Sequence, residues 1–202
     1  MLYAKSIPSI LLYSRLVAVF SIIGLCFSNY PIANLWVIGI MYYGILSDVF
    51  DGIIARKLKV STDSFRIADT IIDLLFYLSI LGFIWCNFPA SIVDNLFFIA
   101  GIFGLELLMY LTCFFRFSKL PSPHAILSKF WGIYIVVEFT LILLNISGFH
   151  FRMALILGLI VHLDRLLIYI LLPKWEHDIP SSYHSLLIRR GKPIKRRKLF
   201  NG

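Results

Sequence analysis

The chain has 202 residues, of which 59% are hydrophobic and only 15% are charged. Soluble domains are about 45–50% apolar and about 25% charged, and several apolar runs here reach the roughly 20 residues that span a bilayer, which excludes a soluble domain. The formal net charge is +8. The basic residues lie between the apolar runs and in the C-terminal tail, where they oppose anionic lipid headgroups, so we expect no nucleic-acid partner.

An all-α integral membrane protein with six transmembrane helices is predicted from the apolar runs and the polar or proline-containing breaks between them. The spans cover roughly 8–28, 33–55, 67–86, 92–115, 127–147 and 151–172. Pro173 ends the last span. We therefore expect a catalytic transmembrane domain over residues 1–173 and a basic cytoplasmic tail over 174–202, bound to anionic lipid headgroups.

Lysine and arginine predict the orientation of the spans. They accompany the N-terminus, the connections between spans two and three and between spans four and five, and the tail, whereas the connections one–two and three–four contain none. The positive-inside rule then places both termini in the cytoplasm. The end of span two and the start of span three lie on that side, where soluble nucleotides and metal ions are available. In a bacterium the membrane would be the inner one.

Four aspartates lie at those two span ends. Asp48 and Asp51 have i,i+3 spacing and Asp69 and Asp73 have i,i+4 spacing, so each pair lies on one helix face. Carboxylates near lipid are energetically expensive and mark ion binding, proton relay or catalysis. Where four of them converge, a cation must lie between them or most must be protonated.

Spans two and three are antiparallel neighbours joined by a short polar loop, so the two aspartate pairs are expected to face one another. Up to eight carboxylate oxygens suit Mg²⁺ or Mn²⁺ rather than zinc. Two such ions clamp a pyrophosphate and stabilise an in-line displacement. Gly52 allows close approach of a ligand, Ala55 keeps the same face open, and Arg56 offers a charge-assisted fork to phosphate oxygens.

The pattern D-x-x-D-G-x-x-A-R followed by D-x-x-x-D closely resembles the signature of the CDP-alcohol phosphotransferases, and the spacing between its two parts also matches. The matching residues are Asp48, Asp51, Gly52, Ala55, Arg56, Asp69 and Asp73. Ile7-Pro8-Ser9 followed by Arg15 resembles the I-P-N…R opening of family members, with serine in place of asparagine. The six-span layout is compatible, but only residues 48–73 are specific.

The resemblance implies a role for each aspartate. Asp48, Asp51 and Asp69 are implied as the main metal ligands, and Asp73 as the general base nearest the incoming alcohol and a further ligand. The implied reaction is attack of a small alcohol's hydroxyl on the phosphate of a CDP-linked donor, with release of CMP. The implied donor is CDP-diacylglycerol, whose tails stay in the bilayer through a lateral opening of the site, and the implied assembly is a homodimer.

Phe65 departs from the family pattern. The family has a glycine four positions before its third aspartate, where it helps to shape the nucleotide pocket, and this chain has phenylalanine. The ring stacks on the base, intrudes on the pocket, or is accommodated by a shifted loop in which Ser64 provides the small position. The sequence does not choose among these three arrangements.

Cationic side chains outside the motif are candidates for binding an anionic acceptor. The candidates are Lys129, Arg165 and Arg116, with Arg15 and Lys119 as further cations for acceptor or donor. Arg165 has an alternative interpretation, a structural network with Asp164 or snorkelling toward an interface. Glu106 and Glu138 lie in apolar spans and are expected to be paired inside the bundle or a cavity. Serine, glycerol 3-phosphate and inositol phosphate stay open as acceptors.

Two other classes of function compete with this enzyme. A cation transporter would use the aspartates as an ion path, but transport sites lie near the bilayer midplane, often at broken helices, whereas these aspartates lie at one membrane face beside a glycine and an arginine suited to phosphate. A non-catalytic lipid- or nucleotide-binding relative is motivated by Phe65.

Overall fold

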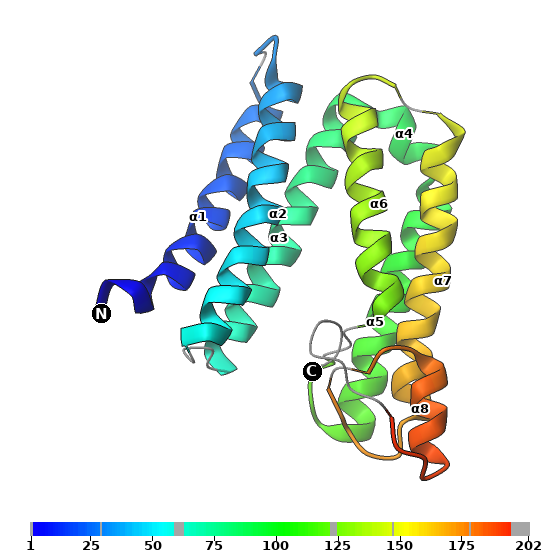
Figure 1. Ribbon diagram of the computed structural model, residues 1–202. Helices are drawn as coiled ribbons and strands as arrows, with labels where there is room; N and C mark the ends of the chain where they lie inside the picture. The colour runs from blue at the N-terminus through cyan, green and yellow to red at the C-terminus, as the bar shows by residue number, and fades with distance from the viewer. Residues whose placement is uncertain are drawn as a thin grey trace. The chain divides into compact units, whose positions relative to one another are not determined.

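The structure is a computed structural model that describes residues 2–28, 30–58, 63–121, 125–146, 148–177 and 179–194. Within the helices, the structure describes the backbone but not the side chains of residues 2–6, 55–57, 63–67, 70 and 149. All regular elements in the described ranges are α-helices (Figure 1). They are α1 (Leu2–Cys26), α2 (Ala33–Leu58), α3 (Asp63–Asn87), α4 (Pro89–Val93), α5 (Leu96–Phe117), α6 (Ile126–Leu143), α7 (Phe149–Leu171) and α8 (Ser182–Arg189).

The prediction of an all-helical protein with apolar spans is confirmed in outline. Five helical segments in the described part of the chain are long and apolar enough to cross a membrane: Ile7–Cys26, Ala33–Ile54, Leu96–Phe117, Ile126–Leu143 and His150–Leu171. The third predicted span corresponds to α3, whose described residues include the apolar stretch Ile71–Asn87. The number of six spans and the cytoplasmic position of both termini remain predictions.

The fourth predicted span contains a helix break that the sequence interpretation missed. It runs from 92 to 115, whereas α4 ends at Val93 and α5 begins at Leu96. Arg152 holds this break, since its Nε donates to the Asn95 side-chain oxygen at 3.1 Å and its Nη2 to the Asp94 carbonyl at 3.2 Å. Asp and Asn favour helix ends because their side chains compete for backbone hydrogen bonds.

The helices divide into two packing units, and α1, α2 and α3 form most of the first. α1 packs along both α2 and α3, around apolar side chains that include Leu12, Ile22, Met41, Phe76 and Phe83. A Cβ at Gly44 on α2 would overlap the Phe76 ring of α3. Because Gly44 lies one turn before Asp48 and Phe76 one turn after Asp73, this close approach sets the separation of the two acidic helix segments.

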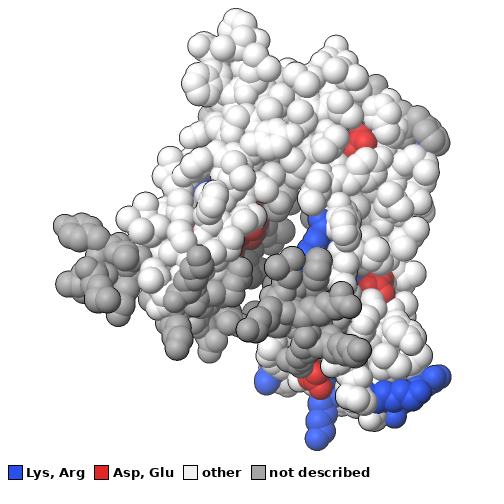
Figure 2. Space-filling view, viewed as in Figure 1, with Lys and Arg blue, Asp and Glu red and all other residues white. Residues whose placement is uncertain are grey.

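In the second unit, α7 packs against α5 and α8. A Cβ at Gly158 would lie 2.8 Å from Ile102 Cδ1 and 2.9 Å from the Trp131 ring, so side chains of α5 and α6 rest directly on the α7 backbone. Few charged side chains lie along the helices on the face in Figure 2, and basic ones gather at its α8 end, where Arg189 and Arg190 are exposed. Such a distribution is typical of a helix bundle whose end meets lipid headgroups.

Candidate functional site

The four aspartates converge on one buried arginine. Asp48 and Asp51 come from α2, Asp69 and Asp73 from α3, and Arg15 from α1. Arg15 is fully buried, at 0% exposure. Because α1 packs along both α2 and α3, the side chain of Arg15 lies between the two aspartate pairs.

Both terminal nitrogens of the Arg15 guanidinium are shared between carboxylates. Nη2 lies 2.5 Å from Asp51 Oδ2 and 2.6 Å from Asp69 Oδ1. Nη1 lies 3.0 Å from Asp48 Oδ1 and also pairs with Asp73 Oδ1. A planar guanidinium suits this arrangement because its donors point in fixed directions within one plane. Arg15 therefore ties α1 to the acidic ends of α2 and α3.

One guanidinium does not balance four carboxylates. If all four are ionised, the five groups carry a net charge of −3, and such an excess is unfavourable away from water. Asp51 Oδ1 is buried and has no hydrogen-bond partner among the described residues. The excess charge and this unsatisfied oxygen leave a place in the cluster for a further cation, or for protons on the carboxylates.

The arrangement fits a divalent metal ion. Asp48, Asp51 and Asp69 each offer a carboxylate oxygen, and these three oxygens all lie within 4.8 Å of one another. An all-oxygen donor set is the choice of hard cations such as Mg²⁺ and Mn²⁺. The Asp51 side chain is 1% exposed, whereas that of Asp48 is 45% exposed. The cluster is thus closed at Asp51 and accessible at Asp48, where a ligand can enter.

The other motif residues are described only in part. Gly52 follows Asp51 on α2 and is half-buried. The backbone of Ala55, Arg56 and Phe65 is helical, but their side chains lie outside the described residues. The phosphate-binding role of Arg56 and the position of the Phe65 ring therefore stay predictions.

The acceptor-binding candidates all lie in the second unit, and both Arg165 and Arg116 have structural partners there. The Arg165 guanidinium forms a two-pronged ion pair with Glu106, with Nη1–Oε2 at 2.7 Å and Nη2–Oε1 at 3.0 Å. Arg116 donates to the last carbonyls of α7, at 2.5 Å to Ile170 and 3.2 Å to Leu172, and so caps that helix end. Lys129 is exposed in the first turn of α6.

Arg165 does not pair with its neighbour Asp164, which was the alternative suggested by the sequence. Asp164 Oδ1 instead accepts from the backbone and the hydroxyl of Ser182, at 3.0 and 2.5 Å. Consecutive residues of a helix point about 100° apart and do not face each other. The expected pairing of the two glutamates in the apolar helices is confirmed, since Glu106 pairs with Arg165 and Glu138 Oε2 lies 3.2 Å from His150 Nδ1.

Sequence reasoning missed the place of Arg15 in the cluster. It grouped Arg15 with the cations available to a substrate phosphate, whereas the structure surrounds it with all four aspartates. A signal was present: an arginine in the middle of an apolar span needs a carboxylate partner, and the aspartates of the next two helices are the nearest acidic residues in the sequence.

The fold and the cluster define an all-helical protein with long apolar helices and, where three helices meet, an acidic cluster that could hold a metal ion. The CDP-alcohol phosphatidyltransferase family model matches residues 5–169, and the chain belongs to this family. No curated protein and no solved structure matches the chain. Family membership confirms the resemblance seen in the motif and supports a transferase of phospholipid biosynthesis.

Proposed function

We propose that the protein transfers a substituted phosphate, the phosphatidyl group of CDP-diacylglycerol, to the hydroxyl of a small alcohol and releases CMP. The observation that carries the proposal is the convergence of four carboxylates from α2 and α3 on the buried Arg15, with an excess of negative charge. Family membership over residues 5–169 supports the same reaction class.

Asp48, Asp51 and Asp69 would hold the metal, with Asp73 as a further ligand of a site for two ions, Mg²⁺ or Mn²⁺. When bound, such ions neutralise the pyrophosphate and lower the pKa of an alcohol placed beside them. Arg15 acts as a positioning residue, because its ion pairs fix the four carboxylates relative to one another. Gly52, Ala55 and Arg56 border the donor phosphates on the same part of α2.

Asp73 is proposed as the general base. Its carboxylate takes the proton of the acceptor hydroxyl, the acceptor oxygen forms a bond to the phosphorus of the phosphatidyl group, and the bond from that phosphorus to the CMP oxygen breaks. CMP leaves with the electron pair of that bond. A positioned base of this kind contributes about 10²- to 10⁴-fold to a rate.

Lys129, Arg165 and Arg116 are the proposed acceptor-binding cations. Arg165 has Glu106 as its partner, so an anionic acceptor would share the guanidinium with that carboxylate. Serine, glycerol 3-phosphate and inositol phosphate differ in charge, and only the two phosphate esters need such cations. An effect of Arg165→Lys on the acceptor KM, with kcat unchanged, would favour a phosphate ester.

We further propose that the chain works as a homodimer with its site on the cytoplasmic face of the membrane. The basic tail beyond residue 174 would bind anionic headgroups on that face. A second candidate function is a non-catalytic lipid- or nucleotide-binding relative, and Phe65 in place of the motif glycine favours it. Phe65→Gly should tighten CDP binding if the ring obstructs the pocket.

The test is release of CMP by the purified protein with CDP-diacylglycerol, Mg²⁺ or Mn²⁺, and a panel of alcohols. We expect acceptor-dependent CMP that falls by about 10²- to 10⁴-fold in Asp73→Asn. Asp94→Asn is the matched control, because it removes the same charge from an exposed turn. Absence of turnover with every donor and acceptor, despite metal binding, would refute the enzyme and leave the non-catalytic relative.

A further inference from the structure

Two cysteines that are far apart in the sequence meet at one end of the first unit. Cys26 is the last residue of α1, and Cys86 lies in the last turn of α3. A side-chain hydrogen bond joins the two thiols. Cys86 is exposed and Cys26 is half-buried, whereas the third cysteine, Cys113, is buried in the second unit. The two sulfurs of this thiol pair, Cys26 and Cys86, are therefore neighbours that a reagent can reach.

The packing of α1 along α3 accounts for this contact. The two helices run in the same direction (Figure 1), and Arg15 of α1 pairs with Asp73 of α3 at the carboxylate cluster. Cys26 follows Arg15 by eleven residues, which is about 17 Å along α1. Cys86 follows Asp73 by thirteen residues, which is about 20 Å along α3. The thiol pair thus lies at one level, on the far side of the unit from the cluster.

Both cysteines also continue the buried faces of their helices. Ile22, four residues before Cys26, and Phe83, three residues before Cys86, are both buried in the core of the unit. Residues three or four apart share a helix face. The thiol pair therefore stands at the end of the packed faces of α1 and α3.

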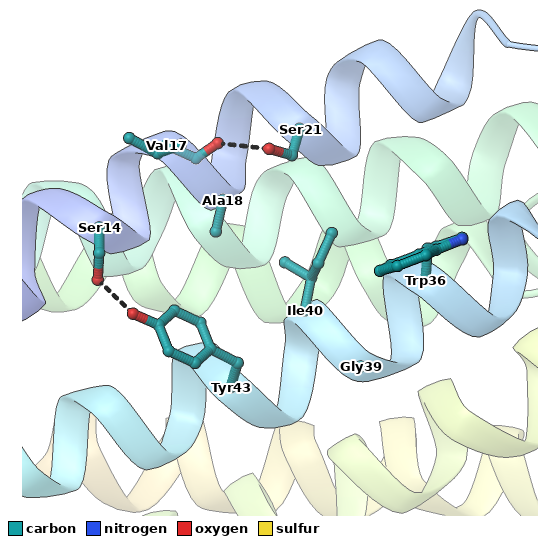
Figure 3. A pocket seen from close by; sticks show the side chains of 8 residues that line it. All are labelled: Ser14, Val17, Ala18, Ser21, Trp36, Gly39, Ile40 and Tyr43. Atoms are coloured by element: carbon teal, nitrogen blue, oxygen red, sulfur yellow. Dashed lines mark hydrogen bonds between the residues drawn. The ribbon is translucent and has the colours of Figure 1, made fainter.

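Polar contacts hold α1 to its neighbour beside the carboxylate cluster rather than near the thiol pair. The hydroxyls of Ser14 and Tyr43 share a hydrogen bond of 2.7 Å between α1 and α2 (Figure 3). Further along α1, the Ser21 hydroxyl donates to the Val17 carbonyl of its own helix at 2.9 Å. Apolar packing alone favours helix association little in lipid, because lipid tails are as apolar as the side chains. A covalent bond at the thiol pair would hold the last turns of α1.

The predicted topology places the thiol pair on the outer side of the membrane. Cys26 lies at the end of the first predicted span and Cys86 at the end of the third. The connections that follow these spans contain no lysine or arginine, so the positive-inside rule puts them opposite the cytoplasm. Compartments on that side are oxidising, and disulfides form and persist there.

We propose that Cys26 and Cys86 form an intramolecular disulfide that joins α1 to α3 on the outer side of the membrane. The oxidant is a reactive disulfide of that compartment. The exposed Cys86 thiolate attacks one sulfur of the oxidant, forms a mixed disulfide and displaces the other oxidant sulfur. The Cys26 thiolate then attacks the Cys86 sulfur and displaces the second oxidant sulfur. The two cysteine protons and two electrons end on the two oxidant thiols.

The bond would act on stability rather than on the chemistry of the carboxylates. It closes residues 26–86, which include all four aspartates, into one loop. A cross-link of this kind stabilises a protein mainly by limiting the unfolded chain. It also links the helix that carries Arg15 to the helix that carries Asp69 and Asp73.

Counting free thiols tests the bond directly. Bacterial cells that make the full chain are lysed in denaturant with a maleimide, and the mass of the intact chain gives the number of labels. We expect one label in the wild type, on Cys113, and three after reduction. Cys26→Ser should carry two labels with or without reduction. Cys113→Ala, the matched control, should carry none before reduction and two after it. Three labels in the unreduced wild type, a bond to Cys113, or a cross-link between two chains would overturn the inference.

The side of the membrane is tested in Cys26→Ser, which leaves Cys86 as an exposed free thiol. A membrane-impermeant maleimide added to intact spheroplasts should label Cys86 in this variant but not in the wild type. Absence of label on Cys86 in Cys26→Ser would contradict the outer position and overturn the inference.

Thermal unfolding in detergent measures what the bond holds. A reductant should lower the Tm of the wild type and of Cys113→Ala by about 5–10 °C and leave that of Cys26→Ser unchanged. An equal response of the wild type and Cys26→Ser would overturn the stabilising link between α1 and α3. These three measurements do not use CMP release, so failure of the proposed function would leave them decisive.

Discussion

Both units of the molecule place an arginine among carboxylates inside apolar helices, but with different charge balance. In the second unit, Arg165 and Glu106 form a two-pronged ion pair, and His162 Nε2 lies 3.6 Å from the same carboxylate. In the first, Arg15 faces four aspartates. The Arg165–Glu106 pair is balanced in charge, whereas the Arg15 cluster carries an excess of negative charge. Each contains a buried atom with no hydrogen-bond partner among the described residues, Nε of Arg165 and Oδ1 of Asp51.

The ratio of arginines to carboxylates distinguishes a structural ion pair from a candidate cation site more clearly than the presence of acidic residues does. A matched buried pair is costly to break but calls for no further ligand. An unmatched cluster is stable only if a ligand or protons supply the missing positive charge. The prediction of metal binding thus rests on the ratio of charges as much as on the spacing of the aspartates.

The largest expected difference concerns the cation requirement of turnover. Asp69→Asn should raise the Mg²⁺ concentration for half-maximal CMP release by about 100-fold, as expected when a metal site loses supporting charge. Glu106→Gln removes a carboxylate from the balanced pair and should leave that Mg²⁺ concentration unchanged, while changing the acceptor KM through Arg165. Equal shifts of the Mg²⁺ requirement in both variants would abolish the distinction between the two regions.

A second comparison uses thermal unfolding of Arg15→Met and Arg165→Met in detergent. Removing one partner of a buried ion pair costs about 3–5 kcal/mol, and less where the pair is partly exposed, as for Arg165 and Glu106. Both variants should therefore unfold at lower temperature in EDTA. Mg²⁺ should restore much of the stability of Arg15→Met, because it replaces the lost positive charge among the aspartates, but none of that of Arg165→Met. Identical responses to Mg²⁺ would contradict this account.

A smaller effect is expected from the glycine that sets the helix separation beside the cluster. Gly44→Ala forces the Phe76 ring to move and should destabilise the protein by about 1–3 kcal/mol, as overpacking does. Gly104→Ala in the second unit has open space at its Cβ and should stabilise by up to about 1 kcal/mol through helix propensity. Thermal unfolding of the two variants measures both, and destabilisation by Gly104→Ala alone would reverse the prediction.

The sequence predicted those parts of the structure that depend on pattern. Apolar runs located the long helices to within several residues, and helical spacing brought each aspartate pair onto one face. The helix break at Asp94–Asn95 was not predicted, because hydropathy averaged over a window stays high when only two polar residues lie between apolar runs. Its stabilising partner, Arg152, lies far away in the sequence.

Partner choice between helices was the part that the sequence did not predict. Arg165 pairs with Glu106 on α5, not with adjacent Asp164, and Arg15 joins the aspartates of α2 and α3. Such pairs depend on which faces of distant helices meet, which periodicity along one helix does not determine. The intramembrane cost of an unpaired charge predicted that partners exist, without identifying them.

Direct counting of bound metal tests the central claim. Electron paramagnetic resonance of Mn²⁺ titrated into the purified, substrate-free protein gives the number of ions held per chain. We predict two in the wild type and in Asp94→Asn, and fewer than one in Asp51→Asn, which changes the buried ligand. Equal Mn²⁺ binding in the wild type and Asp51→Asn, or none in either, would contradict the account.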